Sequence, residues 1–93
     1  MPSEKTELLE KKLAEVAEIH SRTMAAFEAA EIDSATRKEY KRQIDQFESM
    51  YQSLEQMKSI SKEEKTVASL LEKQLALLQE RAGFEAYCLN LWK

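Results

Sequence analysis

The scarcity of glycine and proline constrains this chain more than any other feature of its sequence. Among 93 residues, the only glycine is Gly83 and the only proline is Pro2. Tight β-hairpin turns depend on residues with positive φ angles, so a turn-rich β protein is excluded. The abundant residue types are Glu, Lys, Leu, Ala and Gln, which favour helices. The sequence therefore predicts an all-α protein, and its length allows at most one domain.

Three helix start signals divide the chain. The first is Ser3, which can act as an N-cap. The second is the capping box Thr36-Arg37-Lys38-Glu39, with Asp33 and Ser34 as competing caps just upstream. The third is the capping box Ser61-Lys62-Glu63-Glu64. Because each signal precedes a segment with apolar periodicity, we expect three helices, over residues 4–31, 35–58 and 62–92.

Apolar residues recur every three or four positions in the first two segments, so each segment would turn one apolar face inward. The first stripe consists of Leu9, Leu13, Val16 or Ala17, His20, Thr23 or Met24, Phe27 and Ala30. The second consists of Tyr40, Ile44, Phe47, Tyr51 or Met50, Leu54 and Met57. From Lys58 to Thr66 the only apolar residue is Ile60, which favours a turn. A continuous helix over residues 34–81 is the alternative, since no Gly or Pro forbids it.

The third segment carries two adjacent apolar seams. The first seam comprises Val67, Leu70, Gln74, Leu77, Arg81, Phe84, Cys88 and Leu91. The second comprises Leu71, Leu75, Leu78, Ala82, Leu89 and Trp92. Together they span roughly 200° of the helix surface, compared with about 100° for an ordinary surface helix. Such a helix must be covered on two sides, either by the first two helices or by another chain.

Gly83 lies within the third segment and allows two interpretations. As a C′ residue it would end the helix and leave residues 84–93 as a separate tail. Inside a continuous helix it would cost about 1 kcal/mol. We expect continuity, because the first seam keeps a seven-residue spacing at Leu70, Leu77, Phe84 and Leu91. The predicted fold is an elongated antiparallel three-helix bundle, or helical hairpin, with coiled-coil-like packing and a single helical domain over residues 1–93.

The last ten residues are the densest apolar stretch of the chain. Chain ends are usually polar and frayed, so we expect this one to be held against another surface. That surface is either the first two helices or a partner protein, since Trp and Tyr are enriched at interfaces. The apolar partner-binding candidates of this segment and of the first seam are Leu70, Leu77, Phe84, Tyr87, Leu91 and Trp92.

One basic cluster is present, on one face of the second helix, and it consists of Arg37, Lys38, Lys41 and Arg42. A solvated face is one interpretation of this cluster. The other interpretation is that the cluster binds an acidic partner or contacts the first helix, because cations without such a contact are slightly unfavourable near a helix N-terminus. Residues 1–33 carry four basic and eight acidic side chains. The net charge of −3 argues against nucleic-acid binding, which depends on phosphate contacts.

His20 is the one residue that suggests chemistry. The segment Ile19-His20-Ser21-Arg22-Thr23 resembles the phosphoaccepting histidine of helical phosphotransfer modules, although Met24 stands where those modules have Gly. It also resembles the dimerisation helix of sensor kinases. In those kinases the Arg-Thr pair lies one residue farther from the His and is followed by Pro, whereas here Arg22-Thr23 is followed by Met24. The resemblance implies a phosphotransfer role for His20. Its place on the apolar stripe indicates instead a histidine at the edge of the core.

Other chemistry finds little support. A single Gly excludes phosphate-cradling loops, and one Cys with one His excludes a zinc site. Cys88 lies in an apolar seam and cannot form an internal disulfide, which fits a reducing, cytoplasmic location. The first residues are too charged for a signal peptide, and no apolar run approaches the length of a membrane span. We expect no cofactor, no metal and no small-molecule substrate.

These observations favour a non-enzymatic helical protein–protein interaction module, such as a complex subunit, an adaptor or a small chaperone. It would bind a protein partner or self-associate into an oligomer, through a helix-in-groove contact or by completing a bundle. The alternative is a histidine phosphotransfer-like signalling module that uses His20. That alternative requires an exposed His20 ring with Arg22 nearby.

Overall fold

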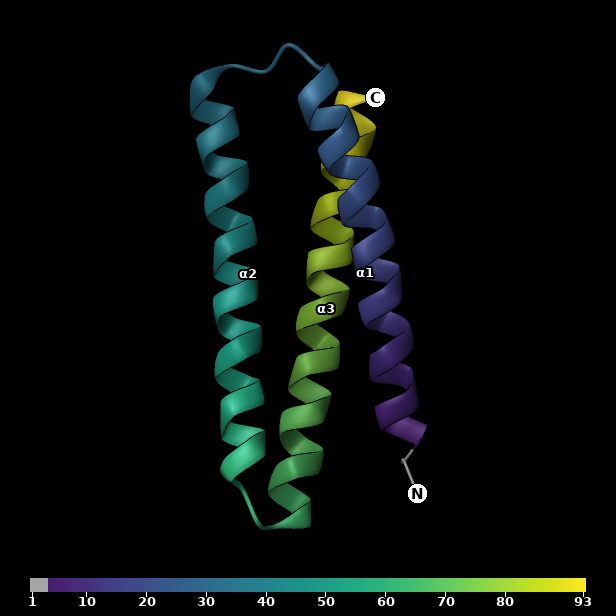
Figure 1. Ribbon diagram of the computed structural model, residues 1–93, viewed down its shortest axis with the longest axis vertical. Coiled ribbons are helices and arrows are strands. Elements are labelled where there is room, and N and C mark those ends of the chain that lie inside the picture. Colours follow the sequence, from purple (N-terminus) through teal and green to yellow (C-terminus); the bar gives the residue numbers. More distant parts are fainter. Residues whose placement is uncertain (1–3) are drawn as a thin grey trace.

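The computed structural model describes residues 4–93, which form three helices and no strand. These are α1 (Glu4–Ala29), α2 (Ser34–Ile60) and α3 (Glu64–Trp92). Consecutive helices run in opposite directions, so α1 and α3 point the same way (Figure 1). The body is elongated and flat, with principal extents of 48 × 22 × 14 Å. The predicted all-α, three-helix architecture is confirmed. The predicted cap Ser3 lies outside the described residues.

The turn between α1 and α2 is built by a single carboxylate and a single guanidinium. The backbone amide of Thr36 donates to the Asp33 carboxylate at 2.8 Å, and this bond lowers the pKa of Asp33. Asp33 is therefore the N-cap of α2, and the predicted capping box at Thr36 is wrong. Arg37 donates to the backbone oxygens of Ala30 and Ile32, both at 3.1 Å. A cation at the start of α2 thus caps the end of α1, where positive charge is favourable.

The turn between α2 and α3 spans residues 61–63. Ser61 adopts an extended conformation with φ −81° and ψ 138°, so a continuous helix over residues 34–81 is wrong. The predicted capping box at Ser61 is also wrong, because Ser61 ends α2 and Glu63 occupies the N-cap position of α3 without a side-chain cap bond. Because the segment from Lys58 to Thr66 has hardly any apolar residue, little packing opposes a break in the helix at residues 61–63.

Gly83 lies inside an uninterrupted α3, as predicted. A methyl group at this position would meet nothing within 4 Å. Both seams consequently run the length of the helix without a change of phase. The alternative in which residues 84–93 form a separate tail is wrong.

The core consists of two clusters that share α3. One lies between α1 and α3 and contains Leu9, Val16, Leu71, Leu78 and Ala82. The other lies at the end where α1 meets α2 and contains Phe27, Tyr40, Ile44 and Cys88, with Phe84 and Trp92 packed against it. The second seam of α3 therefore faces α1. This agrees with the expectation that the wide apolar surface of α3, formed by both seams, is covered on two sides. No helix within residues 4–93 combines the length and the apolar character needed to cross a membrane.

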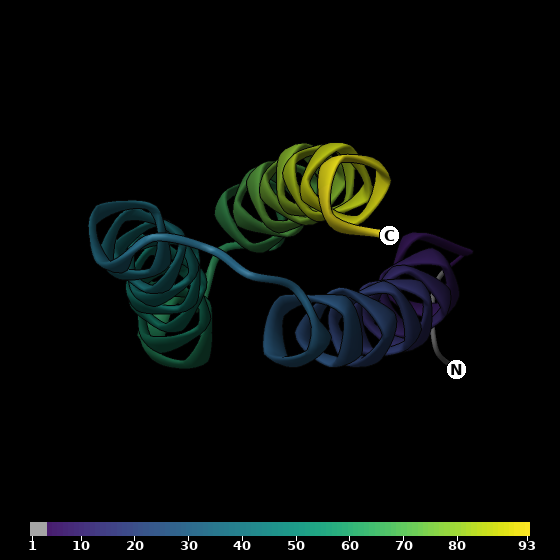
Figure 2. The same ribbon diagram turned by 90° about the horizontal axis from the view of Figure 1, so that it is seen from above.

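Helices α1 and α2 both pack on α3, but not closely on each other. No Cα atom of α1 (Glu4–Ala29) lies within 8 Å of a Cα atom of α2 (Ser34–Ile60). Seen from above, α1 and α2 spread apart on one side of α3 (Figure 2). Three stripe residues that we expected inside the bundle are therefore exposed: Leu13 by 39%, Met50 by 53% and Met57 by 51%. The apolar stripes of α1 and α2 face α3 or open space, and they do not pack closely on each other.

Candidate functional site

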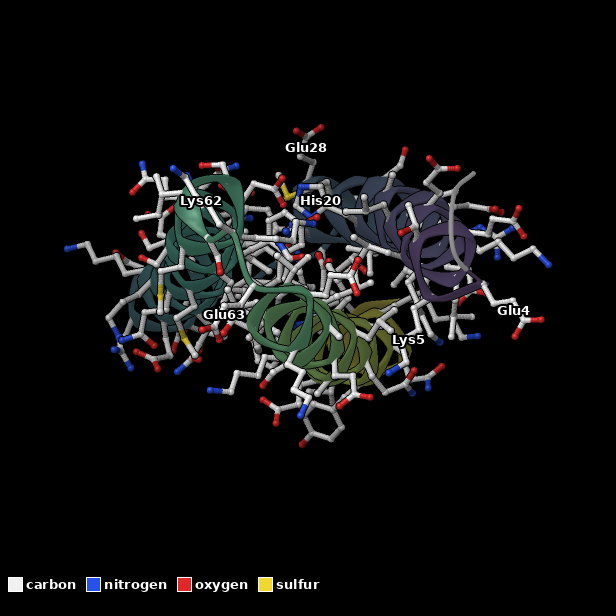
Figure 3. The ribbon with its side chains drawn as sticks, turned by 90° about the horizontal axis from the view of Figure 1, so that it is seen from below. Glu4, Lys5, His20, Glu28, Lys62 and Glu63 are labelled. Carbon is white, nitrogen blue, oxygen red and sulfur yellow. The ribbon has the colours of Figure 1, made fainter. Side chains whose placement is uncertain are left out.

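An open groove runs between α1 and α2, with α3 as its floor. Its volume is about 450 Å³. It is lined by Leu13, Val16, Ala17 and His20 of α1, by Phe47, Glu48, Tyr51 and Gln52 of α2, and by Leu77, Leu78 and Arg81 of α3. We call this the α1–α2 groove. In a view from below, His20 lies between α1 and α2 on the side away from α3 (Figure 3).

The walls of the groove are mainly apolar and aromatic. Leu13 is exposed at its entrance, whereas Val16 and Leu78 are only 4% and 3% exposed in its depth. Phe47 and Tyr51 are half-buried on the α2 side. At the upper end the rings of Phe27 and Tyr40 meet, with centroids 5.2 Å apart, and close the gap between the two helices. The groove is therefore open over its middle, at the level of Leu13 to His20.

A buried carboxylate holds the polar side of the groove together. Glu85 is fully buried on α3, and its Oε1 accepts a hydrogen bond from the Tyr40 hydroxyl at 2.8 Å. The same oxygen lies 2.6 Å from Nδ1 of His20. Its Oε2 accepts from Nε of Arg81 at 3.2 Å, and Arg81 in turn lies 3.5 Å from Glu48. The carboxylate thus links all three helices.

The backbone and the phenol around Glu85 complete this network. The Thr23 hydroxyl donates to the backbone oxygens of Ile19 at 2.8 Å and of Glu85 at 3.2 Å. Burial, together with the bond to Glu85, raises the pKa of the Tyr40 phenol far above its ordinary value. Every buried side-chain nitrogen and oxygen within residues 4–93 has a hydrogen-bond partner. Because isolated buried charges are costly, this pairing is what allows Glu85 to sit in the core.

Sequence reasoning missed Glu85. A signal for it exists, because Leu71, Leu78, Glu85 and Trp92 are each seven residues apart, and three of the four belong to the second seam. A charged residue in phase with an apolar heptad indicates a buried polar contact. Glu48 and Gln52 were also missed, since they lie at the edge of the α2 stripe and carry no apolar signal.

A second polar cluster lies farther down the bundle, between α2 and α3. The side chain of Gln74 is fully buried in the first seam. Its Oε1 accepts from Lys58 at 2.9 Å and its Nε2 donates to Glu55 at 2.7 Å. This bond to Gln74 lowers the pKa of Glu55, with Lys58 contributing to the same shift. The cluster fixes the register of α2 on α3 below the groove.

The predicted apolar partner-binding residues separate into buried and exposed sets. Leu70 and Leu77 are 4% and 6% exposed, so the chain itself covers them. Phe84 stacks on Tyr40 with a centroid distance of 6.0 Å, and Trp92 contacts Phe27 and Tyr40 at 5.4 and 5.0 Å. The C-terminal segment therefore docks on α1 and α2 within the chain.

Tyr87 and Leu91 are the predicted apolar partner-binding residues that remain exposed. They are 64% and 61% exposed. Both line a hollow between α2 and α3, and this hollow is also lined by Tyr40, Phe84 and Trp92. These two side chains are available to a partner, but they do not join the groove.

The predicted basic cluster is largely engaged in contacts within the chain. Arg37 lies over the Phe27 ring at 4.7 Å in addition to its backbone bonds, and Lys41 lies 5.9 Å from the same ring centre. Arg42 donates to Glu39 at 2.6 and 3.0 Å, and these bonds lower the pKa of Glu39 to about 2. Lys38 is exposed. The cluster contacts α1 through the Ala30 carbonyl and the Phe27 ring, not through acidic side chains.

The phosphotransfer alternative requires an exposed His20 ring with Arg22 nearby, and the ring is only partly exposed. The side chain is 33% exposed, and its Nδ1 contacts Glu85, whereas Nε2 has no hydrogen-bond partner among residues 4–93. Arg22, however, pairs with Glu18 at 2.7 Å, and residues two apart on a helix face different directions. The cation near His20 is Arg81, through their shared partner Glu85.

The chain has no match among protein-family models, curated protein sequences or solved structures.

Proposed function

We propose that this chain is a helix-binding interaction module that accepts an amphipathic helix in the α1–α2 groove. It would serve as a complex subunit, an adaptor or a small chaperone. The observation that carries the proposal is that α1 and α2 both pack on α3 while their Cα atoms stay more than 8 Å apart. In a square four-helix bundle, the two neighbours of any helix occupy diagonal corners. The groove lies where the fourth helix of such a bundle would pack.

The lining of the groove supports this assignment. Leucines and aromatic rings supply apolar area for an incoming stripe, at roughly 25 cal/mol per Å² removed from water. The polar cluster around Glu85 lies at one side of the groove and offers His20 Nε2 to a polar group of the partner. A helix that docks on apolar walls beside one polar contact is held in a single register.

The test uses a fluorescent amphipathic peptide of about 18 residues, five helical turns, with a Leu stripe flanked by Gln. We expect saturable binding, measured by anisotropy. Leu13→Glu should abolish it, because Leu13 stands at the groove entrance. Leu8→Glu is the matched control, since Leu8 is also an exposed leucine of α1 but does not line the groove. Equal loss of binding in both variants, with circular dichroism unchanged, would contradict the proposal.

A second candidate function is favoured by Nε2 of His20, which has no hydrogen-bond partner among the residues that the structure describes. The Glu85 carboxylate fixes the ring and makes Nε2 the nucleophilic nitrogen. With phosphoramidate as donor, Nε2 would attack phosphorus, the P–N bond would break and ammonia would leave. Phosphorus NMR should then show a phosphohistidine signal that His20→Ala removes. A wild-type protein that stays unmodified excludes this function and leaves the helix-binding proposal intact.

We also propose a reducing, cytoplasmic location. Cys88 is free and only 5% exposed. Burial, with the Glu85 carboxylate adding to the effect, raises the pKa of the Cys88 thiol, so the thiol stays protonated at neutral pH. A protonated, covered thiol is suited to a compartment without oxidising chemistry. Cell fractionation tests this location, and recovery outside the cytoplasm would contradict it.

A further inference from the structure

Acidic side chains border the α1–α2 groove on its α2 side. Glu48 lines the groove and is 57% exposed. Asp45 is exposed one turn earlier on α2 and shares a neighbouring surface hollow with Glu48 and Gln52, both of which also line the groove. The carboxylates of Asp45 and Glu48 therefore flank the entrance from the same helix.

The α1 side of the groove is acidic as well. Glu10 precedes Leu13 by three residues and Ala17 by seven, so it lies on the face of α1 that borders the groove. Glu28 lies on the same open side of the molecule as His20 (Figure 3), but it follows Phe27 at the closed upper end and does not line the groove. Both Glu10 and Glu28 are exposed.

The basic side chains of the described helices neutralise these edges only in part. Arg42 shares a surface hollow with Asp45, but it donates its hydrogen bonds to Glu39. Arg81 is inside the groove, where it is shared between Glu85 and Glu48. Lys41 lies at the closed upper end, over the Phe27 ring. Three basic residues of α1 form ion pairs with acidic residues outside the groove: Lys5 with Glu72, Lys12 with Glu15 and Arg22 with Glu18. The middle of the groove therefore has apolar walls between two negatively charged edges.

We infer that the helix taken up by the groove carries Lys or Arg on both flanks of its apolar stripe, and that it belongs to a protein other than this one. This inference rests on the proposed helix-binding function. Charge complementarity selects the occupant, because like charges brought together at an interface are strongly disfavoured. A second copy of this chain is a poorer match for these edges, because its own net charge is −3.

The experiment compares three peptides with one Leu stripe and different flanks: all Lys, all Gln or all Glu. We expect the Lys-flanked peptide to bind wild-type protein at least tenfold more tightly than the Glu-flanked one in low salt. The difference should shrink as salt screens the exposed charges. Leu13→Glu should abolish binding of all three peptides, because the apolar contact is common to them.

Charge reversal at the edges tests which carboxylates are responsible. Glu10→Lys combined with Asp45→Lys should reverse the preference, so that the Glu-flanked peptide binds more tightly than the Lys-flanked one. Glu80→Lys is the control, because Glu80 is an exposed acidic residue of α3 beside a different hollow, between α2 and α3. Neither edge residue belongs to the buried network, so the fold should persist in each variant.

The possible outcomes separate the two proposals. Equal binding of all three peptides that is lost in Leu13→Glu overturns the charge inference and leaves the helix-binding function standing. If none of the three peptides binds, the proposed helix-binding function itself is overturned. Light scattering that shows a dimer disrupted by Leu13→Glu overturns the assignment to a different protein, because the occupant would then be a second copy of this chain.

Discussion

Glu85 occupies a position in α3 where the heptad pattern calls for an apolar side chain. It has donors on all sides, from Tyr40 on α2, Arg81 on α3 and His20 on α1. A buried group of this kind contributes little net stability when it is satisfied, but its loss is costly. Glu85 therefore specifies how the three helices meet more than it strengthens their contact.

We predict that Glu85→Gln destabilises the protein by about 1–3 kcal/mol, because three charge-assisted or polar contacts lose the carboxylate. Urea unfolding followed by circular dichroism measures the change. Glu80→Gln, on the exposed face of the same helix, is the control and should leave the unfolding midpoint unchanged. Similar midpoints for the two variants would show that the network does not form in solution.

We predict that stability falls as the pH rises above about 10, partly through Tyr40. The folded-state pKa of this phenol is raised above its ordinary value of 10.0 by burial and by Glu85. Below pH 10 the phenol is neutral in both states. Above pH 10 it ionises first in the unfolded chain, which favours unfolding. Urea midpoints measured from pH 8 to 11 should decline less steeply in Tyr40→Phe. Identical slopes would contradict the assignment.

At the residue scale, the sequence predicted individual inward positions well and their polar partners poorly. His20, Tyr40 and Arg81 all lie on predicted stripes or seams. Their meeting point at Glu85 could not be derived from the stripes, because periodicity places a side chain on a face without specifying what faces it. The N-cap of α2 could not be predicted from the sequence either, because Asp33 and Thr36 are both suitable capping residues. In the structure Asp33 is the N-cap.

At the scale of elements, helix phase was predictable and helix pairing was not. The two seams of α3 predicted a helix covered on two sides, and α1 and α2 do cover it. The same argument placed Leu13 and Met57 inside the bundle, where they are not. An apolar stripe on α1 is satisfied by α3 alone, so nothing in the stripe requires α2 to approach. The α1–α2 groove is present because α1 and α2 do not pack closely against each other.

We predict that Gly83→Ala stabilises the protein by about 0.5–1 kcal/mol. Gly83 lies in the interior of α3, where alanine restricts the unfolded chain and a Cβ would meet nothing within 4 Å. The melting temperature should rise accordingly in thermal unfolding. A lower melting temperature would mean that the backbone at Gly83 departs from helical geometry in solution.

At the scale of the whole molecule, packing is unequal along the long axis. The end near the α1–α2 turn holds the aromatic cluster, in which Phe27 and Tyr40 are each 3% exposed. The opposite end carries Met57 and Ile60, which are 51% and 79% exposed. Few buried contacts secure the last turn of α2, so the two ends of the rod should open with different free energies.

Hydrogen exchange at single-residue resolution should reveal this gradient. We predict that amides of residues 56–60 exchange faster than those of residues 43–47, in the same helix but nearer the aromatic cluster. Local opening at the poorly packed end requires less free energy than opening at the packed end. Uniform protection along α2 would contradict the predicted gradient.

The pairing of α1 with α3 also has a consequence for how the chain is made. The contacts that hold α1 join residues far apart in sequence, with separations of 65 for His20 and Glu85 and 62 for Thr23 and Glu85. Those that hold α2 include the short-range pair Lys58 and Gln74, with a separation of 16. During translation at about 5–20 residues per second, α1 therefore waits roughly 3–12 seconds for α3 to be synthesised. In that interval its apolar stripe is exposed on the nascent chain, where it is open to chaperones.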